Sequence, residues 1–153
     1  MAQRDVITEH VFEIGDWGGE HIADAMNELI LEDIAGMLIV VDLGHMNASA
    51  VDPARIREQL DAFNVEALKF FFGPRTLATC KTVVLFINKS DLLSGPPAKA
   101  EAQAQRLYGK LIDNLLKYQT QINVRVFAGS ASYGHNVHHL FSHLVEKILP
   151  RDA

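Results

Sequence analysis

The chain has 153 residues, of which 48% are hydrophobic and 22% charged, so it is long enough for one compact domain with an apolar core. Its 14 Lys and Arg against 19 Asp and Glu give a net charge of -5, which excludes the class of proteins that act mainly by binding the phosphates of nucleic acids. No apolar run is long enough to cross a bilayer, and the first residues do not resemble a signal peptide. Together with the single cysteine, these features predict a cytoplasmic protein without a transmembrane segment.

The first part of the chain alternates a predicted strand, a predicted helix and a second strand. Residues 6–14 are rich in Val, Ile and Phe and run into a glycine loop, which indicates a strand. Residues 20–34 carry apolar side chains three and four positions apart, which predicts a helix. Residues 37–41 form a continuous apolar run, typical of a strand buried on both faces of a parallel sheet. We expect Asp42, which ends this run, to cap the loop that follows.

The second part of the chain continues the same alternation. Pro53 suits the first turn of a helix, and the apolar residues after it predict one helix up to Phe71. Two strands and two helices are expected after it, at residues 82–87, 98–118, 124–128 and 136–149. This order predicts an α/β fold of three layers, doubly wound around a mostly parallel sheet, in a single domain spanning residues 1–153.

In a parallel sheet the ligand lies beyond the carboxyl ends of the strands, so the residues that follow each strand are the informative ones. Asn88, Lys89, Ser90 and Asp91 follow the predicted strand 82–87. This strand and loop resemble the NKxD guanine-recognition loop of the P-loop GTPases, the superfamily of Ras, the ADP-ribosylation factors and the G-alpha subunits. The resemblance implies that the carboxylate of Asp91 accepts two hydrogen bonds from guanine, that the Lys89 stem lies against the base and sugar, and that Asn88 ties neighbouring loops together.

Two further loops fit the same family. Ser130 and Ala131, which follow the predicted strand 124–128, resemble the SAx loop whose backbone N–H meets the guanine O6 atom. Asp16 and Gly19 fit the DxxG motif, which implies that Asp16 holds Mg²⁺ through water and that the Gly19 N–H meets the terminal phosphate. Glu20 stands where the ADP-ribosylation-factor and G-alpha branch has the glutamine that orients the attacking water. A carboxylate there repels phosphate charge, so fast hydrolysis is not expected.

The family's P-loop and its switch threonine are missing from this sequence. The P-loop pattern GxxxxGK[ST] supplies the phosphate cradle and a Mg²⁺ ligand, and the family has it before the DxxG strand. In the family the P-loop strand lies between the DxxG strand and the next strand of the sheet, so a central strand is absent as well. Three explanations remain open: the other strands close up, another chain supplies the strand, or this chain is the later portion of a longer protein.

The resemblance predicts a GTPase-like domain that lacks its first strand and P-loop and binds GTP or GDP, with Mg²⁺ as an accompanying ion. Its expected partners are the guanine nucleotide and either a second protein or a missing upstream segment. GTP hydrolysis by this chain alone is doubtful. The alternative is a non-catalytic module that keeps the scaffold and binds protein through the surface around Trp17 and Glu20.

The last predicted helix carries four histidines, His135, His138, His139 and His143, at spacings of three and four residues. Three of them could share one face and bind a transition metal. No nearby Asp or Cys completes a ligand set, so we expect them to form the solvated face of that helix.

Overall fold

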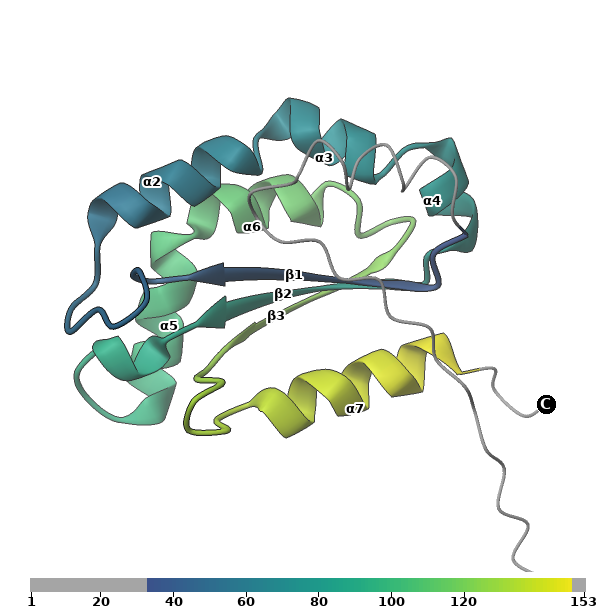
Figure 1. Cartoon of the computed structure of the whole chain (residues 1–153). Coiled ribbons are helices and arrows are strands. Elements are labelled where there is room, and N and C mark those ends of the chain that lie inside the picture. Colours follow the sequence, from purple (N-terminus) through teal and green to yellow (C-terminus); the bar gives the residue numbers. More distant parts are fainter. Residues whose placement is uncertain (1–32, 150–153) are drawn as a thin grey trace, which may run out of the picture.

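Within the part of the chain that the structure describes, three parallel strands form a sheet, with β2 (Thr82–Asn88) between β1 (Gly36–Asp42) and β3 (Asn123–Ala128). The structure is a computed structural model that describes residues 33–149. All three strands were expected from the sequence to within a residue or two at each end. The order of the strands along the sheet follows their order along the chain, as Figure 1 shows.

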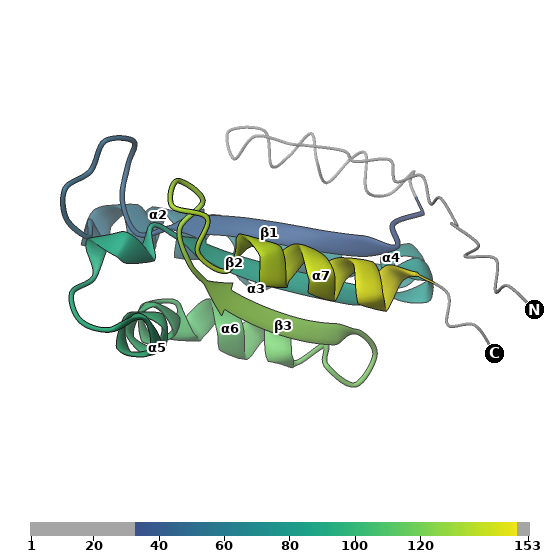
Figure 2. The ribbon, with the colours of Figure 1, turned by 90° about the horizontal axis from the view of Figure 1, so that it is seen from below.

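Helices cover both faces of this sheet, which gives the expected three layers (Figure 1). Among the helices of residues 33–149, only α7 (Val137–Ile148) packs against the second face, and a short 3₁₀ turn, η2 (Ser90–Leu92), follows β2. The helices of the first face are α2 (Pro53–Ala62), α3 (Val65–Phe71), α4 (Pro74–Thr79), α5 (Pro97–Leu107) and α6 (Gly109–Leu116). Figure 2, turned by 90°, shows α7 on one side of the sheet and α2 to α6 on the other.

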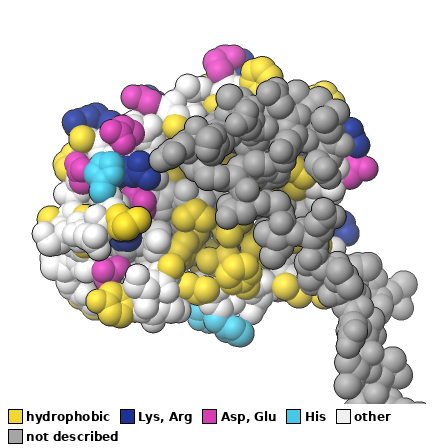
Figure 3. Space-filling model, viewed as in Figure 1, with side chains coloured by type: hydrophobic (Ala, Val, Ile, Leu, Met, Phe, Trp, Pro, Cys, Tyr) yellow, Lys and Arg dark blue, Asp and Glu magenta, His cyan; other side chains and the backbone are white. Residues whose placement is uncertain are grey.

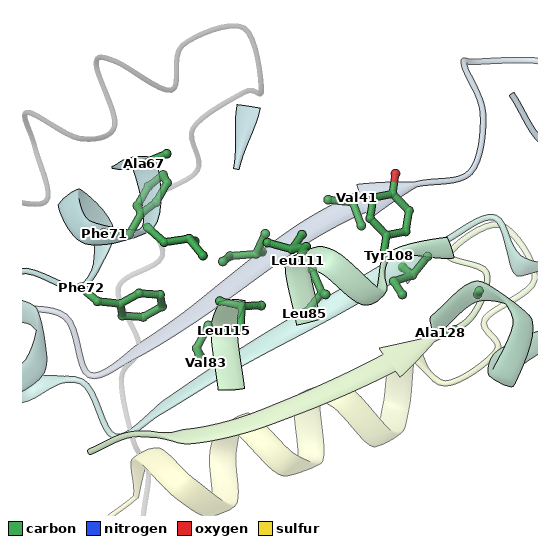
Figure 4. Close-up of a cluster of buried hydrophobic side chains, with 14 of the residues drawn as sticks. Val41, Ala67, Phe71, Phe72, Val83, Leu85, Tyr108, Leu111, Leu115 and Ala128 are labelled. Atoms are coloured by element: carbon green, nitrogen blue, oxygen red, sulfur yellow. The ribbon is translucent and has the colours of Figure 1, made fainter. Parts of the chain in front are cut away.

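The main core lies between the sheet and the helices of the first face. Alternate residues of β2, Val83, Leu85 and Ile87, are fully buried there because the side chains of a strand point to opposite faces in turn. Leu111 and Leu115 of α6 pack against them, as Figure 4 shows. A smaller cluster under α7 contains the intervening residues of β2, Val84 and Phe86, together with Phe127 and Leu140.

Two helices that the sequence pattern predicts as continuous are divided. The expected helix from Pro53 to Phe71 ends first at Ala62, because the Oδ1 atom of Asn64 accepts the N–H of Ala67 at 2.9 Å and starts a new helix. The expected helix over residues 98–118 is interrupted at Tyr108, whose side chain is fully buried. Periodicity alone does not detect either break, because the apolar spacing continues across both.

Several apolar side chains that the pattern places in the core are exposed. Phe141 and Val145 of α7 are 49% and 39% exposed, and only Leu140 of that helix is fully enclosed. Phe70 is also exposed, although Phe71 and Phe72 beside it are buried. Cys80 is buried next to β2, and burial raises the pKa of its thiol to about 11.

The predicted strand at residues 6–14 and residues 20–32 of the predicted helix lie outside the described residues, and the last two residues of that prediction, Asp33 and Ile34, are not helical. Within residues 33–149, every helix is too short or too polar to cross a membrane.

Candidate functional site

The loops that follow β2 and β3 are joined into one unit at the carboxyl edge of the sheet. The backbone N–H of Ser90 donates to the carbonyl of Gly129 at 2.9 Å. The side chain of Asn88 completes the link, because its Oδ1 atom accepts the N–H of Ala131 at 2.9 Å. The structure therefore brings together Asn88, Ser130 and Ala131, and it gives Asn88 the loop-tying contact that the resemblance implies.

Lys89 adopts an unusual backbone conformation that directs its side chain along this edge. Its φ of 68° and ψ of 33° lie in the left-handed region, which non-glycine residues rarely occupy. The backbone N–H of Lys89 donates to the Oδ1 atom of Asn88 at 2.9 Å and so helps to hold this conformation. The Nζ atom reaches the loop after β1, where it donates to the carbonyl of Gly44 at 2.6 Å. Strained residues of this kind are concentrated at functional sites.

Asp91 presents a carboxylate that is available to a ligand. It lies in the η2 turn, is exposed, and makes no hydrogen bond or ion pair with any other residue of the described part. Its position is fixed through the backbone, because the N–H of Leu92 donates to the carbonyl of Lys89 and the N–H of Ser90 reaches Gly129. An exposed acceptor on a braced turn suits recognition of a group with two N–H donors.

The loop after β3 differs in one respect from what the SAx resemblance implies. The N–H of Ala131, expected to meet a ligand oxygen, is already donated to Asn88. The Oγ atom of the buried Ser130 accepts the N–H of Tyr133 at 3.3 Å and thereby shapes the turn. The N–H of Ser132 has no acceptor among the described residues, so it is a donor that this loop still offers.

A polar cluster at the end of β1 supports the same edge and was missed in the sequence. Asp42 does not cap the following loop. Its carboxylate instead accepts a hydrogen bond from the Nε atom of Arg55 at 3.0 Å and lies 3.8 Å from the Nζ atom of Lys89. Asp52 caps α2 in its place. The hydrogen bond to Asp42 raises the pKa of Arg55, so the Arg55 guanidinium keeps its charge.

The interior side of this cluster consists of Gln59 and Tyr108. The Nε2 atom of Gln59 donates to the Tyr108 hydroxyl at 2.7 Å and to the Asp42 carbonyl at 2.9 Å. The Tyr108 hydroxyl donates to the same carbonyl. Burial raises the pKa of Tyr108, with the charge of Asp42 acting in the same direction, so the hydroxyl keeps its proton. The only sequence signal for this cluster is an aspartate directly after an apolar strand, and nothing local relates it to Tyr108.

The residues that the resemblance assigns to the phosphate side of the nucleotide are not among those that the structure describes. Asp16, Gly19 and Glu20, like Trp17, lie outside the described residues. Within residues 33–149 there is no cluster of three or more His, Cys, Asp or Glu side chains suited to a metal ion.

Two histidines of α7, His139 and His143, border a separate hollow of about 450 Å³ between β3 and that helix. His138 and His139 are exposed, as expected, but His143 is half-buried and stands edge-on to Phe127, with ring centroids 6.1 Å apart. The Nε2 atom of His143 lies 2.8 Å from the Oδ1 atom of Asn123. The expectation of a fully solvated histidine face is therefore wrong for His143 and also for His135, which is half-buried.

Removing the Asn88 side chain should weaken the link between the two loops. We expect Asn88→Ala to lower the free energy of unfolding by about 1–2 kcal/mol, because the N–H groups of Ala131 and Lys89 both lose their acceptor. Chemical denaturation measures this change. Asn114→Ala is the matched control, since the Asn114 side chain makes a single, exposed hydrogen bond within residues 33–149, which it accepts from Lys117, and the change should cost less than about 0.5 kcal/mol. Equal losses in the two variants would show that Asn88 does not brace the site.

His143 should make stability fall as the solution becomes acidic. Burial lowers its pKa, and Arg125 and Lys147 lower it further against the opposing effect of Glu146. The unfolded chain therefore takes up a proton near pH 6.5 before the folded chain does. The contribution of neutral His143 to the stability of the folded chain is present above about pH 6.5, and it is lost as the pH falls through the lowered pKa of His143. Between about pH 7.5 and about pH 5.5, we expect the wild-type melting temperature to fall more than that of His143→Gln. The same change at the exposed His139 should leave the pH dependence as in the wild type, and a His143→Gln profile parallel to the wild type would contradict the assignment.

Comparisons with known protein families, with characterised proteins and with solved structures give no match for this chain.

Proposed function

We propose that this protein is a GTPase-like domain that binds guanine nucleotides through the loops after β2 and β3. The observation that carries the proposal is the convergence of Asn88, Asp91 and the Ser130–Ser132 turn at one edge, tied by the 2.9 Å hydrogen bond from Ala131 to Asn88. The strand order, with three parallel strands in chain order, is compatible with the later half of such a domain. These features support the proposal alongside the sequence motifs.

The chemistry of the edge favours guanine over adenine. Guanine presents a ring N–H and an exocyclic amine side by side, and the unpaired carboxylate of Asp91 can accept both. Adenine presents a ring acceptor at the corresponding position, which a carboxylate repels. The N–H of Ser132, which has no acceptor among the described residues, suits the O6 atom of guanine. The aliphatic stem of Lys89, held in place by the bond to Gly44, offers an apolar surface for the base and sugar.

The proposed activity is binding of GDP or GTP and not hydrolysis. The given sequence contains no P-loop pattern to accompany Asp16 and Gly19, which the resemblance assigns to Mg²⁺ and the terminal phosphate. Phosphate contacts supply much of the affinity in this family, so we expect weak binding unless another segment or protein completes the phosphate side. The buried thiol of Cys80 fits the cytoplasmic location that a nucleotide-binding protein of this kind would have.

Thermal unfolding of the whole chain tests the proposal. A ligand that binds only the folded state raises its stability, so millimolar GDP and GTP should each raise the melting temperature while ATP at the same concentration does not. Each nucleotide is added with Mg²⁺, and Mg²⁺ alone is the blank. Equal shifts with ATP would show binding without base recognition, and no shift with any nucleotide would overturn the proposal.

A second candidate is a protein-binding module on the same scaffold, and one observation favours it. Met46 and Tyr133 are 86% and 77% exposed, and they lie in the loops after β1 and β3 at the carboxyl edge of the sheet. Large apolar side chains exposed on neighbouring loops are typical of a protein-binding surface. This candidate predicts no thermal shift with nucleotide, so the same experiment separates the two.

A further inference from the structure

The polar hollow beside β3 and α7 has the size and the lining of a small-molecule site. Its volume of about 450 Å³ is within the range of such sites. Its lining comes from three elements, β3, α5 and α7. Figure 3, viewed as Figure 1, shows histidine side chains at the lower rim of the molecule, beneath a gathering of hydrophobic ones, where Figure 1 places α7. No residue proposed to contact guanine is among the described residues that line the hollow.

Three charged side chains line this hollow, and none of them is paired within residues 33–149. They are Arg125 of β3, Glu101 of α5 and Glu146 of α7. No hydrogen bond or ion pair joins any of them to another residue of the described part, although Glu101 is half-buried. A charge that is partly withdrawn from water and has no partner favours a ligand group of the opposite charge. The hollow therefore offers one positive and two negative groups to a ligand.

The Arg125 guanidinium is suited to a carboxylate. Its Cζ atom lies 5.1 Å from the ring centroid of the buried Phe127, which gives a cation–π contact. This contact uses none of the guanidinium N–H groups as donors, and none of them is donated to another residue of the described part. Two parallel N–H groups of arginine match the two oxygens of a carboxylate. This part of the hollow therefore fits the acidic end of a ligand.

His143 and Glu146 are suited to an ammonium group. The Oδ1 atom of Asn123 accepts the hydroxyl of Thr82 at 3.0 Å and lies 2.8 Å from the Nε2 atom of His143. An amide oxygen can only accept, so Nε2 carries the proton of the neutral ring and Nδ1 keeps a free lone pair. Glu146 lies on the same side of α7 as His143, since residues three apart on a helix are neighbours. An ammonium has donors for both acceptors.

Glu101 lies toward the opposite end of the hollow from Glu146. The Nδ2 atom of Asn136, at the start of α7, donates to the carbonyl of Ala128 at 2.7 Å, at the carboxyl edge of the sheet. Glu146 lies about 15 Å further along that helix, at 1.5 Å per residue. Glu101 is in the second turn of α5, which stands beside the arrowheads of the strands (Figure 1). A ligand that meets both carboxylates must therefore be elongated and carry two cationic groups.

We propose that this hollow binds a free α-amino acid with a basic side chain, such as lysine or arginine. The carboxylate of the ligand pairs with Arg125, its α-ammonium lies between His143 and Glu146, and its side-chain cation pairs with Glu101. Such a ligand carries one net positive charge, which balances the single excess negative charge of the lining when the histidines are neutral. The site does not depend on nucleotide binding.

Titration of the wild-type chain with free lysine, followed in the amide spectrum at about pH 7.5, tests the proposal, since an ordinary histidine is mostly neutral there. Lysine and arginine should each shift the amide signals of Arg125, His143 and Glu146 in a saturable way, while those of Lys89 and Asp91 stay unchanged. Glutamate has the opposite side-chain charge, and cadaverine is lysine without its carboxylate, so both should bind at least roughly 10-fold more weakly. No saturable shift with lysine, or equal affinity for glutamate or cadaverine, would overturn the proposal.

Variants of the lining test the individual contacts. Arg125→Gln should weaken lysine binding roughly 10-fold or more, because the carboxylate loses its charged donor. Arg57→Gln is the matched control, at an exposed arginine of α2 outside the hollow, and should bind lysine as the wild type does. Glu101→Gln should reduce the preference for lysine over alanine. Equal affinities in Arg125→Gln and Arg57→Gln, or an unchanged preference in Glu101→Gln, would contradict the proposal. If a lining variant does not fold, the comparison of ligands on the wild-type chain still decides the question.

Discussion

Replacing Gly129 with alanine should destabilise the protein strongly and disrupt the loop after β3. A Cβ atom at this position would lie 2.1 Å from the carbonyl oxygen of His135, and 3.0 Å from its carbonyl carbon. The clash is with backbone and not with the end of a flexible side chain, so the loop itself must move. The same carbonyl accepts the N–H of Ser130, which makes movement costly. We expect the free energy of unfolding to fall by roughly 1–3 kcal/mol or more.

Gly109→Ala provides the matched control for this substitution. No atom lies within 4 Å of a Cβ built at Gly109, which is the first residue of α6. Alanine favours a helix over glycine by up to about 1 kcal/mol, so this variant should be neutral or more stable. Denaturant unfolding of the two variants beside the wild type measures both effects. Equal changes would contradict the close approach of the two loop segments at Gly129.

The second large effect concerns the base that the protein prefers. Asp91→Asn should weaken GDP binding by roughly 10- to 100-fold, because two hydrogen bonds to a charged acceptor are replaced by at most one hydrogen bond to a neutral acceptor. An amide at this position offers one acceptor and one donor. Xanthine matches that pair with its ring N–H and its additional carbonyl, so the variant should bind xanthosine diphosphate better than GDP. Calorimetric titration of both nucleotides into the wild type and the variant gives the ratio of the two affinities for each protein.

Asp113→Asn makes the same change of charge elsewhere, at an exposed position on α6. Its preference for GDP should equal that of the wild type. If Asp91→Asn and Asp113→Asn bind the two nucleotides alike, Asp91 does not read the base. A protein-binding module that ignores nucleotides would likewise show no reversal.

Much of the sheet could be predicted from the sequence because its strands are short apolar runs bounded by polar residues. This pattern predicts strands at residues 37–41 and 82–87, and the observed strands are longer by only one or two residues. The helix breaks at Asn64 and Tyr108 could not be predicted from periodicity. They depend on a local cap in one case, and on a buried side chain with partners far along the chain in the other.

The candidate site could be predicted where its residues follow one another along the chain. Asn88, Lys89 and Asp91 form a local pattern, and the contact of Asn88 with the second loop follows from the adjacency of β2 and β3. The left-handed conformation of Lys89 has no sequence signal, since lysine does not favour it. The contact of Tyr108 with Asp42 has no sequence signal either, because it joins residues on separate elements.

The central claim is that guanine is read by the loops after β2 and β3, and a GDP titration followed in the amide spectrum tests it most directly. We predict that GDP shifts the amide signals of Lys89, Asp91 and Ser132, that the signals bordering the hollow beside His143 stay unchanged, and that ATP shifts none of the three. An unchanged spectrum with GDP, or shifts that appear equally with ATP, would contradict the account.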